Sequence, residues 1–172
     1  VYHLTSPLSG QRAIPPLGCG ATIRSLCRGE EGALIDLMNR SFGFKRLDME
    51  EVMSWYKVPG FSEEWIQVAE LDGRLISATV CMLDHEYFRH FGRRRGYLGP
   101  AATLPEYRKA GLTSALTIRA MNFLARQGME SAAMYIIEGK SASLGLALKL
   151  GFRVAKHWVH MNKDLRGSRR PP

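Results

Sequence analysis

The stretch from Arg95 to Gly128 constrains the fold of this chain more than any other part of its sequence. It reads as a short strand, a turn, a basic loop that contains Gly111, and a long amphipathic helix. Pro105 ends the strand, because proline has no N–H to donate to a β-ladder. From Leu112 onward apolar residues recur at three- and four-residue spacing, which predicts a helix that stops near Gly128.

The junction between this loop and the helix has the chemistry of an anion-binding site. The first turn of a helix carries amide groups without intrahelical partners, and the helix dipole adds partial positive charge there, so phosphates bind readily. Arg108 and Lys109 add formal charge, and Gly111 lets a ligand approach the backbone. Thr113 and Ser114 offer hydroxyl donors. The same residues are also compatible with a helix whose entry is merely basic and exposed.

Two stretches resemble the GNAT superfamily of N-acetyltransferases. PEYRKAGLTSAL, residues 105–116, is similar to the family's acyl-coenzyme A motif, Arg/Gln-x-x-Gly-x-Gly/Ala. Arg108 and Gly111 match this motif, whereas Thr113 stands where Gly or Ala is usual. YIIEGKSASLGLALKLGF, residues 135–152, resembles the family's later strand, loop and helix. Two motifs in the family's order and spacing are more specific than one, and the similarity points to the mycothiol synthase-like branch.

The resemblance implies an α/β fold with a mixed, mostly antiparallel sheet, a splayed central strand pair and flanking helices. Residues 96–104 would form one splayed strand and 131–138 the other, and Gly99-Pro100 suits an irregular strand. The GNAT acyltransferase domain would comprise residues 21–165. We expect an irregular arm over residues 1–20, which are rich in proline and glycine, and a disordered basic tail over residues 166–172.

Local patterns predict the remaining elements. Helices are expected over residues 30–42, 48–58 and 141–150, the last with Ser141 as N-cap, and strands over residues 21–27, 65–71, 74–83 and 152–165. Asp72-Gly73 suits a tight hairpin turn. Residues 85–96 read as an exposed hairpin end. They do not form a zinc helix, since His85 and His90 are five residues apart rather than four.

The resemblance also implies the reaction and its co-substrate. The chain would use acetyl-CoA, without a metal, to acetylate a small-molecule or protein amine by direct attack in a ternary complex. In GNAT proteins the first two helices help to wall the acceptor site, so Phe42, Phe44 and Trp55 are candidates there, with core packing as the alternative. The implied coenzyme-binding residues are Ala102, Thr103, Leu104, Arg108, Lys109, Ala110, Gly111, Leu112, Thr113, Ser114, Lys140 and Ser143.

The catalytic residue stays open. The family often has a tyrosine as proton donor four residues before Gly-Phe, but this chain has Ala147 there, which cannot transfer a proton. Lys140 replaces the family's usual asparagine and could contact a phosphate. Tyr135 and Glu138 are the candidates for the catalytic group; the other titratable groups considered are Glu70, His85 and His157.

Composition limits the alternatives. The net charge of +8 favours anionic partners, so nucleic-acid binding through Arg93–Arg95 and the basic tail is a less favoured alternative. A GNAT-fold module that binds acyl-CoA without turnover is another. Three scattered cysteines suggest reduced thiols in a cytoplasmic protein. No apolar run approaches the ~20 residues that span a bilayer, so no membrane partner is expected. The oligomeric state is open, a homodimer included.

Overall fold

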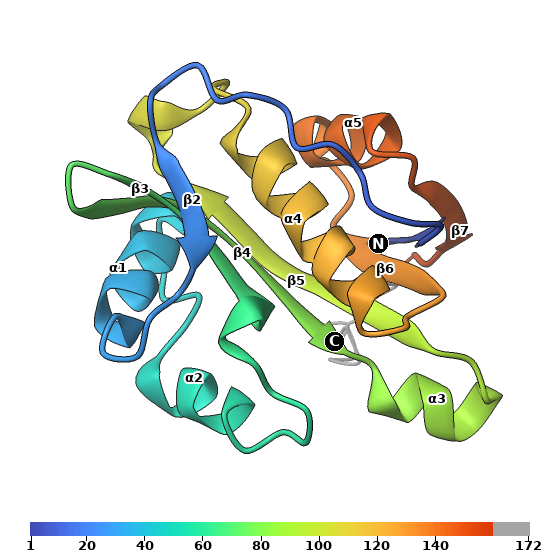
Figure 1. Ribbon diagram of the computed structural model, residues 1–172. Coiled ribbons are helices and arrows are strands. Elements are labelled where there is room, and N and C mark those ends of the chain that lie inside the picture. Colours follow the sequence, from blue (N-terminus) through green and yellow to red (C-terminus); the bar gives the residue numbers. More distant parts are fainter. Residues whose placement is uncertain (160–172) are drawn as a thin grey trace, which may run out of the picture.

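The computed structural model describes residues 1–159, which form one seven-stranded sheet with helices on both faces (Figure 1). Two predictions lie outside the described residues: the tail over residues 166–172, and the last part, residues 160–165, of the strand predicted over residues 152–165. In chain order the elements are β1 Tyr2–Pro7, β2 Thr22–Ser25, α1 Glu31–Phe42, α2 Met49–Trp55, η1 Glu63–Trp65, β3 Ile66–Leu71, β4 Arg74–Leu83, α3 His85–Phe91, β5 Arg95–Thr103, η2 Pro105–Tyr107, α4 Leu112–Arg126, β6 Ser131–Ile136, α5 Ser141–Lys149 and β7 Arg153–His157.

The sheet has the strand order β2-β3-β4-β5-β6-β1-β7, and among these described strands only β5 and β6 run parallel to each other. These two strands pair over just three rungs, from Arg95 opposite Ser131 to Tyr97 opposite Ala133. Beyond this point they separate, while the register of β5 on β4 shifts around Gly99-Pro100. The predicted mixed sheet with a splayed central pair is therefore confirmed.

Helices α1 and α4 pack against the same central strands, β4 and β5, from opposite faces of the sheet (Figure 1). The apolar stripe of α4 is almost wholly buried, and Gly96 of β5 lies directly beneath Leu124. Helix α5 lies on the same face as α4 (Figure 1). Among residues 1–159, no helix has the length and apolar character that crossing a membrane requires.

The interpretation of residues 1–20 as an irregular arm is wrong for Tyr2–Pro7. These residues form β1, which inserts between β6 and β7 and pairs antiparallel with both. Leu4 is fully buried. The stretch is too short for its period to stand out, and two neighbouring strands supply the hydrogen bonds that make it a strand. The segment between β1 and β2 is attached to α4 by a hydrogen bond from the Arg12 amide to Asn122 Oδ1 at 2.8 Å.

The expectation of a hairpin end over residues 85–96 is also wrong, because residues 85–91 form helix α3. Asp84 is its N-cap and accepts a hydrogen bond from the Tyr87 amide at 3.0 Å, and Gly92 ends the helix in the left-handed conformation. Both are standard helix-boundary signals. A smaller correction concerns α5, whose N-cap is Lys140 rather than Ser141.

Two local predictions are confirmed. The Asp48 side chain accepts from the Glu51 amide at 2.9 Å and begins α2, as a capping residue does. Asp72 and Gly73 both have positive φ in the turn between β3 and β4, which is what a two-residue hairpin turn requires.

Candidate active site

A hollow of about 550 Å³ lies between the start of α4 and one face of α5. It is lined by Thr103, Tyr107, Arg108, Lys109, Gly111, Leu112, Thr113, Ser114, Ala142, Gly145, Leu146 and Lys149. The predicted basic loop and the predicted later helix therefore meet at one site.

The charge distribution of this hollow suits an anion. Gly111 is the N-cap of α4 with φ +78°, no side chain caps the helix, and its first turn holds no acidic residue. The orphan amides at this end are therefore not claimed by a capping side chain. Arg108, Lys109 and Lys149 border the hollow, so formal charge adds to the partial positive charge of the helix dipole.

The Arg108 side chain has a structural task in this loop. Its Nε donates to the Thr103 carbonyl at 3.4 Å, and its Nη2 donates to the Ser41 carbonyl, near the end of α1, at 3.2 Å. The guanidinium thus ties the loop to the strand before it and to a helix on the other face. Lys109, by contrast, has φ +68° and makes no side-chain hydrogen bond or ion pair among the described residues, so its charge is available to a ligand.

Thr113, the departure from the family motif, belongs to a chain of hydroxyl groups. Its Oγ1 lies 2.9 Å from Thr103 Oγ1, which lies 2.7 Å from Ser77 Oγ. Ser77 in turn donates to the Ala102 carbonyl at 2.9 Å. The first turn of α4 is therefore fastened to β5 and β4 by the side chain that the family usually omits.

We expect Thr113→Ala to destabilise the fold by about 1 kcal/mol, the usual net contribution of such a hydrogen bond, and to leave acetyl-CoA affinity within twofold. Thr113→Ser, which keeps the hydroxyl, should lie close to the wild type. Urea unfolding and calorimetric titration would measure the two effects. A large loss of affinity with unchanged stability would show that the Thr113 hydroxyl serves the ligand instead.

The predicted coenzyme-binding residues divide into two groups. Thr103, Arg108, Lys109, Gly111, Leu112, Thr113 and Ser114 line the hollow, whereas Ala102, Leu104, Ala110, Lys140 and Ser143 do not. Sequence reasoning missed the α5 face made of Ala142, Gly145, Leu146 and Lys149. Their spacing of three, four and seven residues was a usable signal, because such positions share one helical face.

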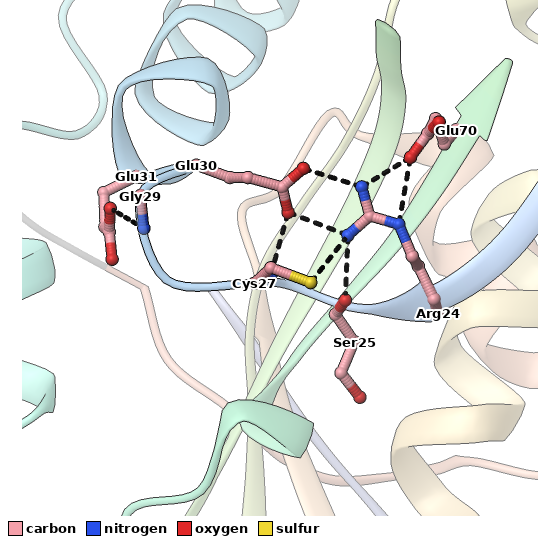
Figure 2. A network of polar contacts seen from close by, with 7 residues as sticks. All are labelled: Arg24, Ser25, Cys27, Gly29, Glu30, Glu31 and Glu70. Atoms are coloured by element: carbon pink, nitrogen blue, oxygen red, sulfur yellow. Dashed lines mark hydrogen bonds and ion pairs between the residues drawn. The ribbon is translucent and has the colours of Figure 1, made fainter. Parts of the chain in front are cut away.

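The weaker catalytic candidates Glu70 and His85 make structural contacts. Glu70 accepts a hydrogen bond at 2.9 Å from Nε of Arg24, which lies on the edge strand β2 between Glu70 and Glu30 (Figure 2). The hydrogen bond from Arg24 to Glu30 lowers the pKa of the Glu30 carboxyl. His85 Nε2 lies 2.8 Å from the Pro59 carbonyl. These contacts give Glu70 and His85 structural roles.

Of the two leading candidates, Tyr135 lies in the splayed part of β6 and Glu138 follows the end of that strand. Glu138 lies 3.6 Å from His157 in an exposed pair. Tyr135 is 44% exposed, stacks on the His3 ring and meets the Tyr97 ring at a tilt. Ala147, at the position where the family often has tyrosine, is fully buried. Within residues 1–159, no cluster of three or more His, Cys, Asp or Glu side chains could hold a metal ion.

Of the aromatic residues considered for the acceptor side, Trp55 belongs to the core. Phe42 and Phe44 are exposed and meet edge to face at 5.8 Å at the end of α1. Core packing therefore accounts for Trp55 and leaves the phenylalanine pair unexplained.

The site thus belongs to an α/β domain whose sheet opens between its two parallel strands, beside an uncapped helix end. Residues 22–154 match the acetyltransferase (GNAT) domain, so the chain belongs to the GNAT acetyltransferase family, as its motifs suggested.

Two curated relatives are mycothiol acetyltransferases. The one from Acidimicrobium ferrooxidans is 27% identical over 156 residues, which is 86% of this chain and 48% of the relative. The one from Amycolatopsis mediterranei is 26% identical over 144 residues, covering 80% and 48%. The chain thus spans about half the length of these relatives.

Solved structures share the fold. A GCN5-related N-acetyltransferase from Sphaerobacter thermophilus superposes with a TM-score of 0.73 at 18% identity, over 89% of this chain and 47% of that one. The aminoglycoside acetyltransferase meta-AAC0020 from an uncultured soil metagenomic sample has a TM-score of 0.67 at 16% identity, covering 85% and 97%.

Proposed function

We propose that this chain is an acetyl-CoA-dependent N-acetyltransferase that acetylates an amine by direct attack in a ternary complex. The observation that carries this proposal is the hollow at the start of α4, with its uncapped amides and basic rim. The pyrophosphate of the coenzyme would lie on the amides of the first turn. Lys109 and Lys149 would neutralise its phosphates.

The opening between β5 and β6 gives the thioester a place to react. The pantetheine arm would run along the β5 backbone at Ala102, Thr103 and Leu104 toward the point where the strands separate. There the amine nitrogen attacks the thioester carbonyl, a C–N bond forms, and the C–S bond breaks. The nitrogen loses a proton and the thiolate gains one. Because no covalent enzyme intermediate is needed, much of the acceleration would come from holding the two substrates in attack geometry.

A second candidate, an acyl-CoA-binding module without turnover, is favoured by one observation. Ala147 is buried and carries no hydroxyl at the position of the family's usual acid. Calorimetric titration with acetyl-CoA, followed by measurement of thiol release over a panel of amines, separates the two. Amine-dependent thiol release supports the transferase, saturable binding without release supports the module, and no binding contradicts both.

Lys149→Gln should weaken acetyl-CoA binding about fivefold, because an exposed ion pair contributes up to about 1 kcal/mol. Lys140→Gln is the matched control: it removes the same charge at the other end of α5, from a residue that does not line the hollow. It should change the affinity by less than twofold in the same titration. Equal effects of the two substitutions would mean that only the overall charge of the protein matters.

A further inference from the structure

The sheet carries a group of neighbouring rings, some stacked and some tilted, on the face away from α4 and α5. We call Tyr97, Tyr135, His3 and Trp158 the aromatic surface. His3 stacks on Tyr135 with ring centroids 4.9 Å apart and on Trp158 at 5.7 Å. Tyr135 also meets Tyr97 at 5.7 Å and Trp158 at 5.8 Å. Four rings from three strands and the end of β7 thus form one continuous group.

The backbone places this group beside the opening of the sheet. Gly96 faces Leu124 of α4, and successive residues of a strand point to opposite faces, so Tyr97 faces away from α4. Tyr97 and Ala133 form the last rung before β5 and β6 separate. Tyr135 follows two residues later on the same face, directly opposite His3 of β1. The aromatic surface and the hollow therefore lie on opposite faces of the sheet, with the opening between them.

The aromatic surface is accessible. Tyr135 is 44% exposed and Trp158 is 42% exposed, although large aromatic side chains are mostly well buried. Exposed tyrosine and tryptophan offer wide apolar faces with little conformational entropy to lose, and they are enriched where proteins bind ligands.

His3 lies inside the group and carries an unused polar atom. Arg95 Nη1 lies 3.5 Å from His3 Nε2. Arginine can only donate, so Nε2 accepts and Nδ1 carries the hydrogen. Nδ1 is buried and has no hydrogen-bond partner in the described part of the chain. Buried donors of this kind are normally paired, so Nδ1 is an unsatisfied polar atom inside the group, and the exposed rings of Tyr135 and Trp158 are the parts that a ligand can reach.

The charges around His3 also restrict the ligand. Burial lowers the pKa of His3, and so do the positive charges of Arg95 and Lys156. The Asp84 carboxylate raises this pKa, but its effect is the smallest of the four. The Asp84 carboxylate is itself paired with Arg95. The surroundings are thus net cationic, which disfavours a polycationic ligand and favours the uncharged form of a single amine.

We propose that the aromatic surface binds the acceptor and that this acceptor is a monoamine carrying a planar aromatic or heteroaromatic group. The planar group stacks on Tyr135 and Trp158, and the amine reaches the opening between β5 and β6. The assignment of this ligand as the acetyl acceptor rests on the proposed function, whereas its binding to the surface does not.

The test compares two ligands of similar shape, 2-phenylethylamine and 2-cyclohexylethylamine, titrated into the protein with and without saturating CoA. We expect the aryl amine to bind about fivefold more tightly, because an aromatic pair contributes about 1 kcal/mol beyond buried area. Tyr135→Leu should remove this preference, and Tyr135→Phe should keep it. Differential scanning calorimetry should show that all three proteins are folded, so that a preference lost in Tyr135→Leu reports the missing ring.

Three results would overturn the inference: equal affinities for the two amines, binding of neither, or a preference that persists in Tyr135→Leu. Light scattering adds a fourth, a dimer that Tyr135→Leu dissociates, since a second copy would then occupy the surface. Failure of the proposed function looks different. If acetyl-CoA does not bind but the aryl preference and its dependence on Tyr135 remain, the aromatic surface stands and the transferase does not.

Discussion

Replacing Gly111 with glutamate is expected to weaken acetyl-CoA binding at least 100-fold. Gly111 is the N-cap of α4 and lines the hollow, so a carboxylate there would face the pyrophosphate. Like charges brought together at an interface cost several kcal/mol, and about 2.7 kcal/mol corresponds to a factor of 100. Calorimetric titration of the wild type and the variant with acetyl-CoA measures the difference directly.

The substitution should leave the protein folded. A Cβ at Gly111 meets no atom within 4 Å, although φ is +78°, so the main cost is backbone strain of about 1–2 kcal/mol. Gly111→Asn is the matched control, because asparagine tolerates this conformation and carries no charge. It should bind acetyl-CoA more tightly than the glutamate variant does. If Gly111→Glu folds and binds normally, the coenzyme is not held at this helix end.

The second large effect is expected at Gly96, where alanine should destabilise the fold by about 2–3 kcal/mol. A Cβ there would overlap Cδ1 of Leu124 and lie 2.5 and 2.9 Å from Cδ2 and Cγ of the same side chain, which is fully buried. Forcing an extra methyl into such packing costs about 1–3 kcal/mol. In a protein of this size that lowers the melting temperature by roughly 4–12 °C, which differential scanning calorimetry would record.

Two further variants test the cause of this effect. Gly99→Ala is the control in the same strand, because its Cβ would lie 3.6 Å or more from Val80, an ordinary contact. It should cost much less than Gly96→Ala. Combining Gly96→Ala with Leu124→Ala should cost less than the sum of the two single changes by 1 kcal/mol or more, since the two residues are in contact. Additive costs would show that Gly96 does not support α4.

Local sequence signals predicted the elements around the site well. The apolar period of α4, the proline after β5, the Asp72-Gly73 turn and the Asp48 cap each depend on a few consecutive residues. Propensity, capping and turn chemistry act at that range. The two GNAT-like motifs likewise identified the family without any tertiary information.

The missed elements depend on distant parts of the chain. β1 is a strand because β6 and β7, more than 100 residues away, pair with it. Lys149 lines the hollow and Lys140 does not, because the packing of α5 against its surroundings decides which helical face turns inward. α3 is a different case, because Asp84 and Gly92 were readable boundary signals that the proposed hairpin obscured.

By itself, therefore, the sequence determined the family, the splayed α/β sheet and the basic loop that leads into α4, because repeating patterns and short motifs encode them. The tertiary structure alone decided that β1 completes the sheet, that Thr113 fastens α4 to β5, and that the aromatic surface gathers beside the opening. Such features arise where strands and helices far apart in the chain come into contact, and no local periodicity records which residues will meet there.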